Sequence, residues 1–162
     1  MNSGEYILVT GSSGLIGSRF IEYIIERDNL QLDEEGFYPG IIGIDLEADW
    51  GNHFRVLNIR HWELDLASDA APSVLDEIFT QYNIKYVYHF AAYAAEILSY
   101  FMRSFNYKNN MVATSNIFNT CVRHGVDKLI YTSSMSVYGD CIPPYMEIQR
   151  PSPKDPDRKS VV

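Results

Sequence analysis

The chain has 162 residues, of which 46% are hydrophobic and 21% are charged, as expected for one globular domain with a buried core. Its 21 acidic residues outnumber its 13 basic ones, and the net charge of −8 argues against a nucleic-acid-binding surface. Two cysteines cannot form a disulfide framework or a four-cysteine zinc site, and no apolar run approaches the roughly 20 residues of a membrane span. The first five residues are polar and carry no basic side chain, unlike a signal peptide, so we expect a cytoplasmic protein.

Short apolar segments alternate with amphipathic ones along the chain. The expected strands are residues 6–10, 41–45, 62–66, 85–90 and 128–133, and the expected helices are residues 15–27, 72–82 and 105–123. The first two strands are continuously apolar, which is typical of strands buried on both faces of a sheet. This alternation predicts an α/β fold with right-handed crossovers, a Rossmann-type doubly wound parallel sheet covered by helices on both faces.

The last expected helix and the segment after it set the boundary of the domain. The helix carries one apolar face, and His124-Gly125 is expected to end it. That face consists of Met111, Val112, Ser115, Phe118 and Val122. Residues 143–162 hold five of the seven prolines and many charges, so we expect a domain over residues 1–142 followed by a proline-rich loop over residues 143–162.

Three glycines stand between the first strand and the first helix, at Gly11, Gly14 and Gly17. Their G-x-x-G-x-x-G spacing is a relative of the dinucleotide-binding fingerprint, in which glycines allow a tight turn and a close approach of the backbone to a pyrophosphate. The first amides of the helix, at Leu15 and Ile16, would then face the phosphates. The alternative is a turn that is glycine-rich without binding a cofactor.

Asp45 ends the second strand and supports the cofactor interpretation. A carboxylate at this place accepts hydrogen bonds from both ribose hydroxyls of adenosine and repels a 2′-phosphate, which favours NAD over NADP. Two alternatives remain open at this point. Asp45 is also compatible with an ordinary exposed strand end, and a nearby basic side chain such as Arg55 would reverse the cofactor preference.

Five segments in order resemble one family, the extended short-chain dehydrogenase/reductases, and within it the NAD-dependent epimerase/dehydratase family of sugar-nucleotide enzymes. The resemblance extends from Tyr6 to about Gly139. The matching segments are TGSSGLIG (10–17), ELDL (63–66), HFAAY (89–93), NNMVATSN (109–116) and TSSMSVYG (132–139). By this resemblance the chain is the N-terminal cofactor-binding half of such a fold, without the substrate-binding portion that follows it in the family.

The resemblance also assigns roles to residues. The cofactor-binding set, besides the three glycines and Asp45, is Leu15, Ile16, Asp65, Leu66, Phe90, Ala91, Ala92, Asn109 and Ser133, with Asp65 and Leu66 at the adenine. Ser134 corresponds to the catalytic serine, which hydrogen-bonds the substrate hydroxyl that is oxidised. Small side chains at Ala91 and Ala92 let a cofactor lie against the backbone, although each alone is equally compatible with an ordinary core alanine. Tyr138 matches a structural position of the family rather than a base.

The family's catalytic tyrosine and lysine, four residues apart, are missing. The corresponding place reads Pro156–Val162, with Asp157 where the tyrosine is expected and Val161 where the lysine is expected. None of the 12 tyrosines has a lysine four positions later. An aspartate with an ordinary pKa near 3.9 does not replace a phenol with one near 10, and losing positioned acid–base catalysis costs about 10²–10⁴-fold in rate.

The functional expectation is therefore an NAD-dependent epimerase or dehydratase acting on a nucleotide-sugar, with activity absent or impaired in this chain. The alternatives are a non-catalytic dinucleotide-binding module, and a reductase or decarboxylase of the same superfamily. An uncovered sheet edge favours a partner, so a homodimer is a further expectation. No metal is expected, because His53, His61, His89 and His124 lack the spacing of metal ligands.

Overall fold

The computed structural model describes residues 4–47, 58–94 and 101–152, and these form one parallel sheet with helices on both faces. The strands are β1 (Tyr6–Thr10), β2 (Ile41–Asp45), β3 (Arg60–Glu63), β4 (Ile84–His89) and β5 (Lys128–Tyr131). Their order is β3-β2-β1-β4-β5, and each neighbouring pair is parallel. The order reverses direction between β1 and β4, as in a Rossmann-type doubly wound sheet, which confirms the predicted fold class.

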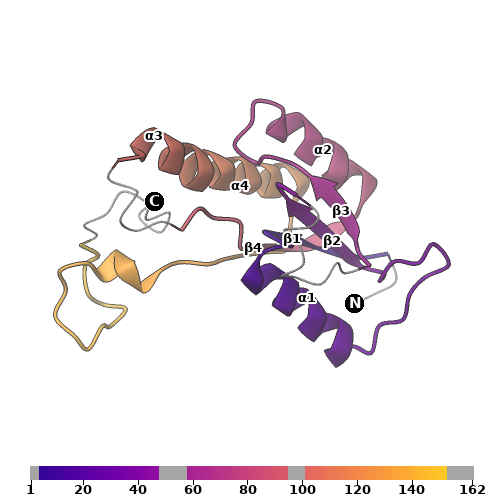
Figure 1. The fold of residues 1–162 in the computed structure, drawn as a ribbon, viewed down its shortest axis with the longest axis horizontal. Helices are drawn as coiled ribbons and strands as arrows, with labels where there is room; N and C mark the ends of the chain where they lie inside the picture. Colours follow the sequence, from indigo (N-terminus) through magenta and orange to yellow (C-terminus); the bar gives the residue numbers. More distant parts are fainter. Residues whose placement is uncertain (1–3, 48–57, 95–100, 153–162) are drawn as a thin grey trace.

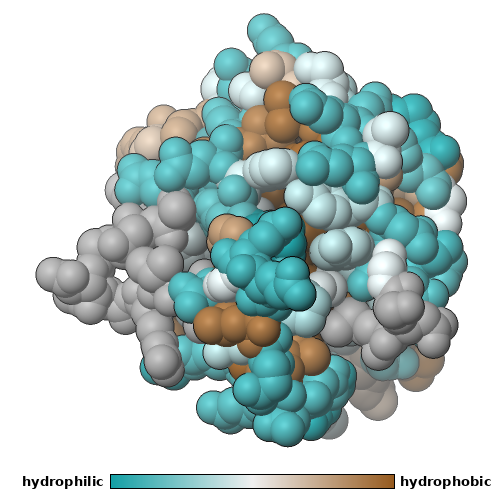
Figure 2. All heavy atoms as spheres, turned by 90° about the vertical axis from the view of Figure 1, so that its right-hand side faces the viewer, coloured by the Kyte–Doolittle hydropathy of each residue, from teal (hydrophilic) through white to brown (hydrophobic). Residues whose placement is uncertain are grey.

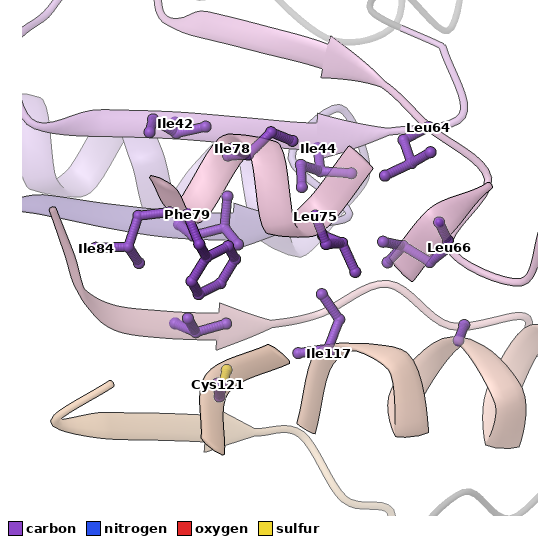
Figure 3. Close-up of a cluster of buried hydrophobic side chains, with 14 residues drawn as sticks. Ile42, Ile44, Leu64, Leu66, Leu75, Ile78, Phe79, Ile84, Ile117 and Cys121 are labelled. Carbon is purple, nitrogen blue, oxygen red and sulfur yellow. The ribbon is translucent and has the colours of Figure 1, made fainter. Parts of the chain in front are cut away.

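Helices lie on both faces of the sheet (Figure 1), and a layer of buried hydrophobic side chains lies under each face's helices. Helix α1 (Leu15–Arg27) packs on one face, where Ile21 and Ile24 join the cluster of Ile7 and Val9 from β1 and Ile41 from β2. Helices α2 (Ala71–Gln81) and α4 (Ala113–His124) cover the other face. There Leu75, Ile78 and Ile117 point toward the strands (Figure 3). Because both faces are covered, β1 and β2 are apolar at almost every position, as predicted.

The third strand begins two residues and ends three residues earlier than predicted. It ends at Glu63, and the Asp65 carboxylate then accepts the Ala67 amide at 2.8 Å, which turns the chain out of the ladder. Leu64 and Leu66 are buried nevertheless, in the layer under α2 and α4. The apolar pair that suggested a strand therefore belongs to the core but follows the strand.

The long helix predicted over residues 105–123 consists of three consecutive elements. They are α3 (Arg103–Asn106), a π-helical segment η2 (Tyr107–Val112) and α4. The predicted apolar face is wrong: Val122 is 80% exposed and Phe118 43% exposed. The residues that α4 buries are Ala113, Thr114, Ile117, Thr120 and Cys121. The helix ends as predicted, at a left-handed Gly125 with φ of 64°.

The predicted apolar face failed because two stripes of α4 carry apolar residues. The helix turns its smaller and more polar stripe to the sheet, where Thr114 hydrogen-bonds a buried imidazole. Hydropathy predicts that a stripe with threonines faces the solvent. A hydropathy pattern carries no information about a buried hydrogen-bond partner such as this imidazole.

After β5, which ends two residues before the predicted end, the chain forms a short 3₁₀ helix, η3 (Met135–Tyr138). Residues 143–152 contain no helix or strand. Backbone hydrogen bonds from Asp140 to Ser152 and from Ser152 to Val137 tie the end of this segment to η3. The domain boundary at residue 142 stays a prediction.

The surface and composition of the described residues add three observations. On the face shown in Figure 2, hydrophilic side chains divide the apolar surface into separate patches. Among the described residues, no helix is long and apolar enough to cross a bilayer, and no cluster of three or more metal-ligating side chains occurs. Both cysteines are free thiols.

Candidate functional site

The glycine turn lies at the carboxyl ends of the strands, beside the point between β1 and β4 where the strand order reverses. Open α/β sheets bind their ligands at this place. Gly11 has a φ of +70°, and a Cβ there would stand 2.7 Å from the Ala91 amide nitrogen. A Cβ on Gly17 would stand 2.0 Å from the Gly11 carbonyl oxygen. The absence of a side chain at these two glycines therefore lets the turn pack directly against the residues that follow β4 and against the start of α1.

Gly14 has a different role, because it leaves space rather than closing a contact. It is the N-cap of α1, with φ of −76°, and no side chain caps the helix. A Cβ on Gly14 would meet only the Gly11 carbonyl oxygen, at 3.3 Å. The amides of Leu15 and Ile16 belong to the first helical turn, which has no acceptors within the helix. The turn thus presents backbone donors and the positive end of a helix dipole to an anion.

Asp45 ends β2 directly beside this turn. Its Oδ2 accepts the Ser13 amide at 2.9 Å, and its Oδ1 accepts the Leu46 amide at 2.8 Å. Both oxygens are thereby fixed in orientation, and each keeps lone-pair capacity for a further hydrogen bond. A diol is the ligand that suits such a carboxylate, so the donor set fits the ribose of a dinucleotide whose phosphates lie on the helix start.

His61 lies behind the turn on β3. Its Nε2 is 3.4 Å from the Ser13 hydroxyl. Burial lowers the pKa of His61, while the charges of Asp45 and Glu63 oppose that shift. The folded state therefore prefers the neutral imidazole.

This preference predicts a pH dependence of stability. The pKa of His61 is lower in the folded chain than its unfolded value near 6.5. The contribution of His61 to the free energy of unfolding is therefore fully present above pH ~6.5 and is lost as the pH falls below that value. Replacing His61→Gln should reduce the difference in the free energy of unfolding between pH about 7.5 and about 5.5, measured by urea titration. An unchanged difference would contradict the preference of the folded state for a neutral His61.

A buried polar network connects three of the motifs. His89, the last residue of β4, is fully buried, with Nδ1 2.6 Å from the Thr10 hydroxyl and Nε2 3.0 Å from the Thr114 hydroxyl. Each ring nitrogen thus has a hydroxyl partner, and the tautomer of the imidazole decides which partner donates. The Ala91 amide donates to the same Thr10 oxygen at 3.3 Å. The network thus fixes the chain after β4 against the glycine turn.

The paired asparagines of η2 have different hydrogen-bond partners. The Asn110 amide brackets Tyr93, accepting its N–H at 2.8 Å and donating to its carbonyl at 2.9 Å. Asn109, which by resemblance is a cofactor ligand, donates to the carbonyl of Phe105 in α3 at 2.9 Å. Sequence reasoning missed Asn110, although the adjacent pair of asparagines was the available signal. The role of Asn109 stays a prediction.

The remaining predicted residues lie along the same edge of the sheet or close to it. Ser133 and Ser134 follow β5 and are exposed, and the Ser134 hydroxyl accepts the Ser136 amide at 3.2 Å as the cap of η3. Tyr138 stacks on Tyr145 with ring centroids 4.9 Å apart, a packing role. The other members are Asp65 and Leu66 after β3, and Phe90, Ala91 and Ala92 after β4. Arg55, His53, Asp157 and Val161 lie outside the described residues.

Comparisons with known proteins agree with this geometry. A family model for the NAD dependent epimerase/dehydratase family matches residues 7–159. UDP-glucose 4-epimerase of Dictyostelium discoideum is 34% identical over 141 residues, which cover 84% of this chain and 38% of that protein. Two solved structures, each 26% identical, are similar: UDP-glucose 4-epimerase of Thermotoga maritima with UDP-glucose, with a TM-score of 0.77, and MoeE5 with UDP-glucuronic acid and NAD, with a TM-score of 0.74.

The matches cover most of this chain and less than half of each relative. The Thermotoga structure is covered to 46% and the MoeE5 structure to 44%, against 93% and 94% of this chain. The five motifs, within residues 10–139, lie inside the range that the family model matches. The chain belongs to the NAD-dependent epimerase/dehydratase family.

Proposed function

We propose that this chain is the NAD-binding part of an enzyme that epimerises or dehydrates a nucleotide-sugar, with a UDP-sugar as the substrate. The observation that carries the proposal is the uncapped start of α1 at Gly14 beside the oriented carboxylate of Asp45. An anionic diphosphate and a ribose diol, joined as in NAD, match these two features. The related structures of UDP-glucose 4-epimerase with UDP-glucose and of MoeE5 with UDP-glucuronic acid and NAD support the same assignment.

Each residue of the site has a separate task in this proposal. The amides of Leu15 and Ile16 hold the diphosphate, and Asp45 accepts the ribose hydroxyls. Asp65 and Leu66 contact the adenine. When bound, NAD supplies a temporary acceptor for hydride from the sugar.

The loop after β4 and the serines after β5 would serve the reacting end. Ala91 and Ala92 offer a smooth backbone surface, which the bond from the Ala91 amide to Thr10 holds in place. Ser133 lies beside the cofactor, and the Ser134 hydroxyl donates a hydrogen bond to, or accepts one from, the sugar hydroxyl. Asn109 would reach the cofactor only after its bond to Phe105 opens.

A second candidate function is a dinucleotide-binding module without catalysis. The observation that favours it is the absence from the sequence of a tyrosine with a lysine four residues later. Without that pair, the sequence lacks the two residues that by resemblance take the proton from the sugar hydroxyl. For this chain alone we therefore expect cofactor binding with little or no turnover.

Two measurements on the same preparation test the proposal. Calorimetric titration with NAD should give saturable binding, and incubation with UDP-glucose and NAD should give slow or undetectable formation of UDP-galactose. Gly14→Val is the matched variant, because its Cβ would meet only the Gly11 carbonyl oxygen, at 3.3 Å, while its two methyl groups add bulk at the helix start. NAD binding of equal strength in Gly14→Val would refute the proposed phosphate site.

Two further expectations accompany the proposal. We expect the chain to act in the cytoplasm, consistent with two free thiols. We expect a homodimer, since the outer stripe of α4 exposes Val122 and Phe118.

A further inference from the structure

We propose that Glu63 is a second determinant of cofactor choice, acting with Asp45 to exclude the 2′-phosphate of NADP. The inference rests on the proposed function, because it concerns the same adenosine end of the NAD site. Neither the glycine turn nor Asp45 alone would predict this role for Glu63.

The register of the sheet places the two carboxylates side by side. Strands β2 and β3 are parallel, with Asp45 paired to Glu63 and Gly43 paired to His61. Neighbouring strands lie about 4.8 Å apart, and side chains two residues apart share a face. A Cβ on Gly43 would stand 2.7 Å from the Ile59 side chain and 3.0 Å from the His61 ring, in the layer under α1. Asp45 and Glu63 therefore end their strands on this same face.

The two charges act together on the region between these strands. Both carboxylates raise the pKa of His61 against the effect of its burial, so the fields of both reach the imidazole. A 2′-phosphate on a ribose held by Asp45 would enter the same region with a charge near −2 at neutral pH. Its repulsion by two carboxylates is greater than its repulsion by Asp45 alone.

The arginine on the same strand binds two other carboxylates. Arg60 bonds Asp33 and Glu35, each at 2.9 Å, and its guanidinium lies 5.1 Å from the Phe37 ring centroid. It is held by the loop before β2, away from the carboxyl end of the strand. Glu63 is exposed, so salt should screen its effect strongly.

The test compares Glu63→Gln with the unchanged chain in calorimetric titrations with NAD and NADP, at low and at high salt. Glu63→Gln removes the charge and keeps the shape. We expect NADP affinity to rise about fivefold and NAD affinity to change less than about twofold, with the difference shrinking at high salt. The matched control is Glu77→Gln, an exposed carboxylate on α2 across the sheet, which should leave both affinities unchanged.

The outcomes separate this inference from the function on which it rests. If Glu63→Gln leaves the ratio of NADP to NAD affinity unchanged while Asp45→Asn shifts it, Glu63 has no part in cofactor choice and the NAD site stands. A shift of equal size in Glu77→Gln would reduce the effect to net charge and also overturn the inference. If the folded, unchanged chain binds neither dinucleotide, the proposed function fails together with it.

Discussion

Gly17→Ala should destabilise the fold more than any other single methyl group added to the glycine turn. The new Cβ would lie 2.0 Å from the Gly11 carbonyl oxygen, 2.8 Å from the Gly11 carbonyl carbon and 2.9 Å from the Ser12 Cα. All three are backbone atoms, so no rotamer change relieves the contact. Overpacking commonly costs about 1–3 kcal/mol, and we expect the upper end or more here because α1 must shift away from β1. Urea unfolding measures the loss, with NAD binding lost in parallel.

Gly14→Ala is the matched control for this prediction, since it adds the same methyl group three residues earlier. Its φ of −76° suits any residue, and its one close neighbour would be at 3.3 Å. We expect its free energy of unfolding to stay within about 1 kcal/mol of the unchanged chain. Equal stability of the Gly17→Ala and Gly14→Ala variants would show that the turn is not packed as described.

Asp45→Asn should cause the largest loss of NAD affinity among substitutions that preserve the fold. The carboxylate accepts one amide on each oxygen, from Ser13 and from Leu46. An asparagine has one oxygen, so its NH₂ group must face one of those N–H donors. We expect NAD affinity to fall about 10- to 100-fold and NADP affinity to fall less, because the repulsion of the 2′-phosphate is removed.

Calorimetric titration with both dinucleotides measures this effect, and Asp76→Asn serves as the control. Asp76 is a carboxylate on α2 whose oxygen bonds Arg123 at 2.8 Å, on the other side of the sheet. The control should bind both dinucleotides as the unchanged chain does. The same ratio of NAD to NADP affinity before and after the Asp45 change would remove its assignment to the ribose.

The sequence predicts the elements whose bounds are marked by local signals, such as apolar runs and glycines. The first two strands and the first helix have the predicted bounds, because uninterrupted apolar runs and a glycine cluster mark their ends. Gly11 and Asp45 occupy the places that their spacing indicated. The separate functions of the three glycines were not predictable, since whether a Cβ meets backbone or open space depends on the packed turn.

Features that depend on partners distant in the chain were missed. His89 joins Thr10 and Thr114, which are 79 and 25 residues away from it, and none of the three residue types indicates a buried network by itself. The buried face of α4 was predicted wrongly for the same reason, because the hydrogen bond between Thr114 and His89 favours the inward position of Thr114. Asn110 likewise finds its partner, Tyr93, 17 residues earlier. Hydropathy periodicity carries no information about such pairs.

The central claim is that a dinucleotide places its diphosphate on the first amides of α1, and amide NMR spectra recorded during a titration with NAD test it most directly. The account predicts the largest shifts at Leu15, Ile16 and Gly17, with further shifts at Asp45 and Leu46, and no such pattern with a nucleoside that lacks phosphate. Unmoved α1 amides in a folded chain at saturating NAD, or shifts gathered at another part of the molecule, would contradict it.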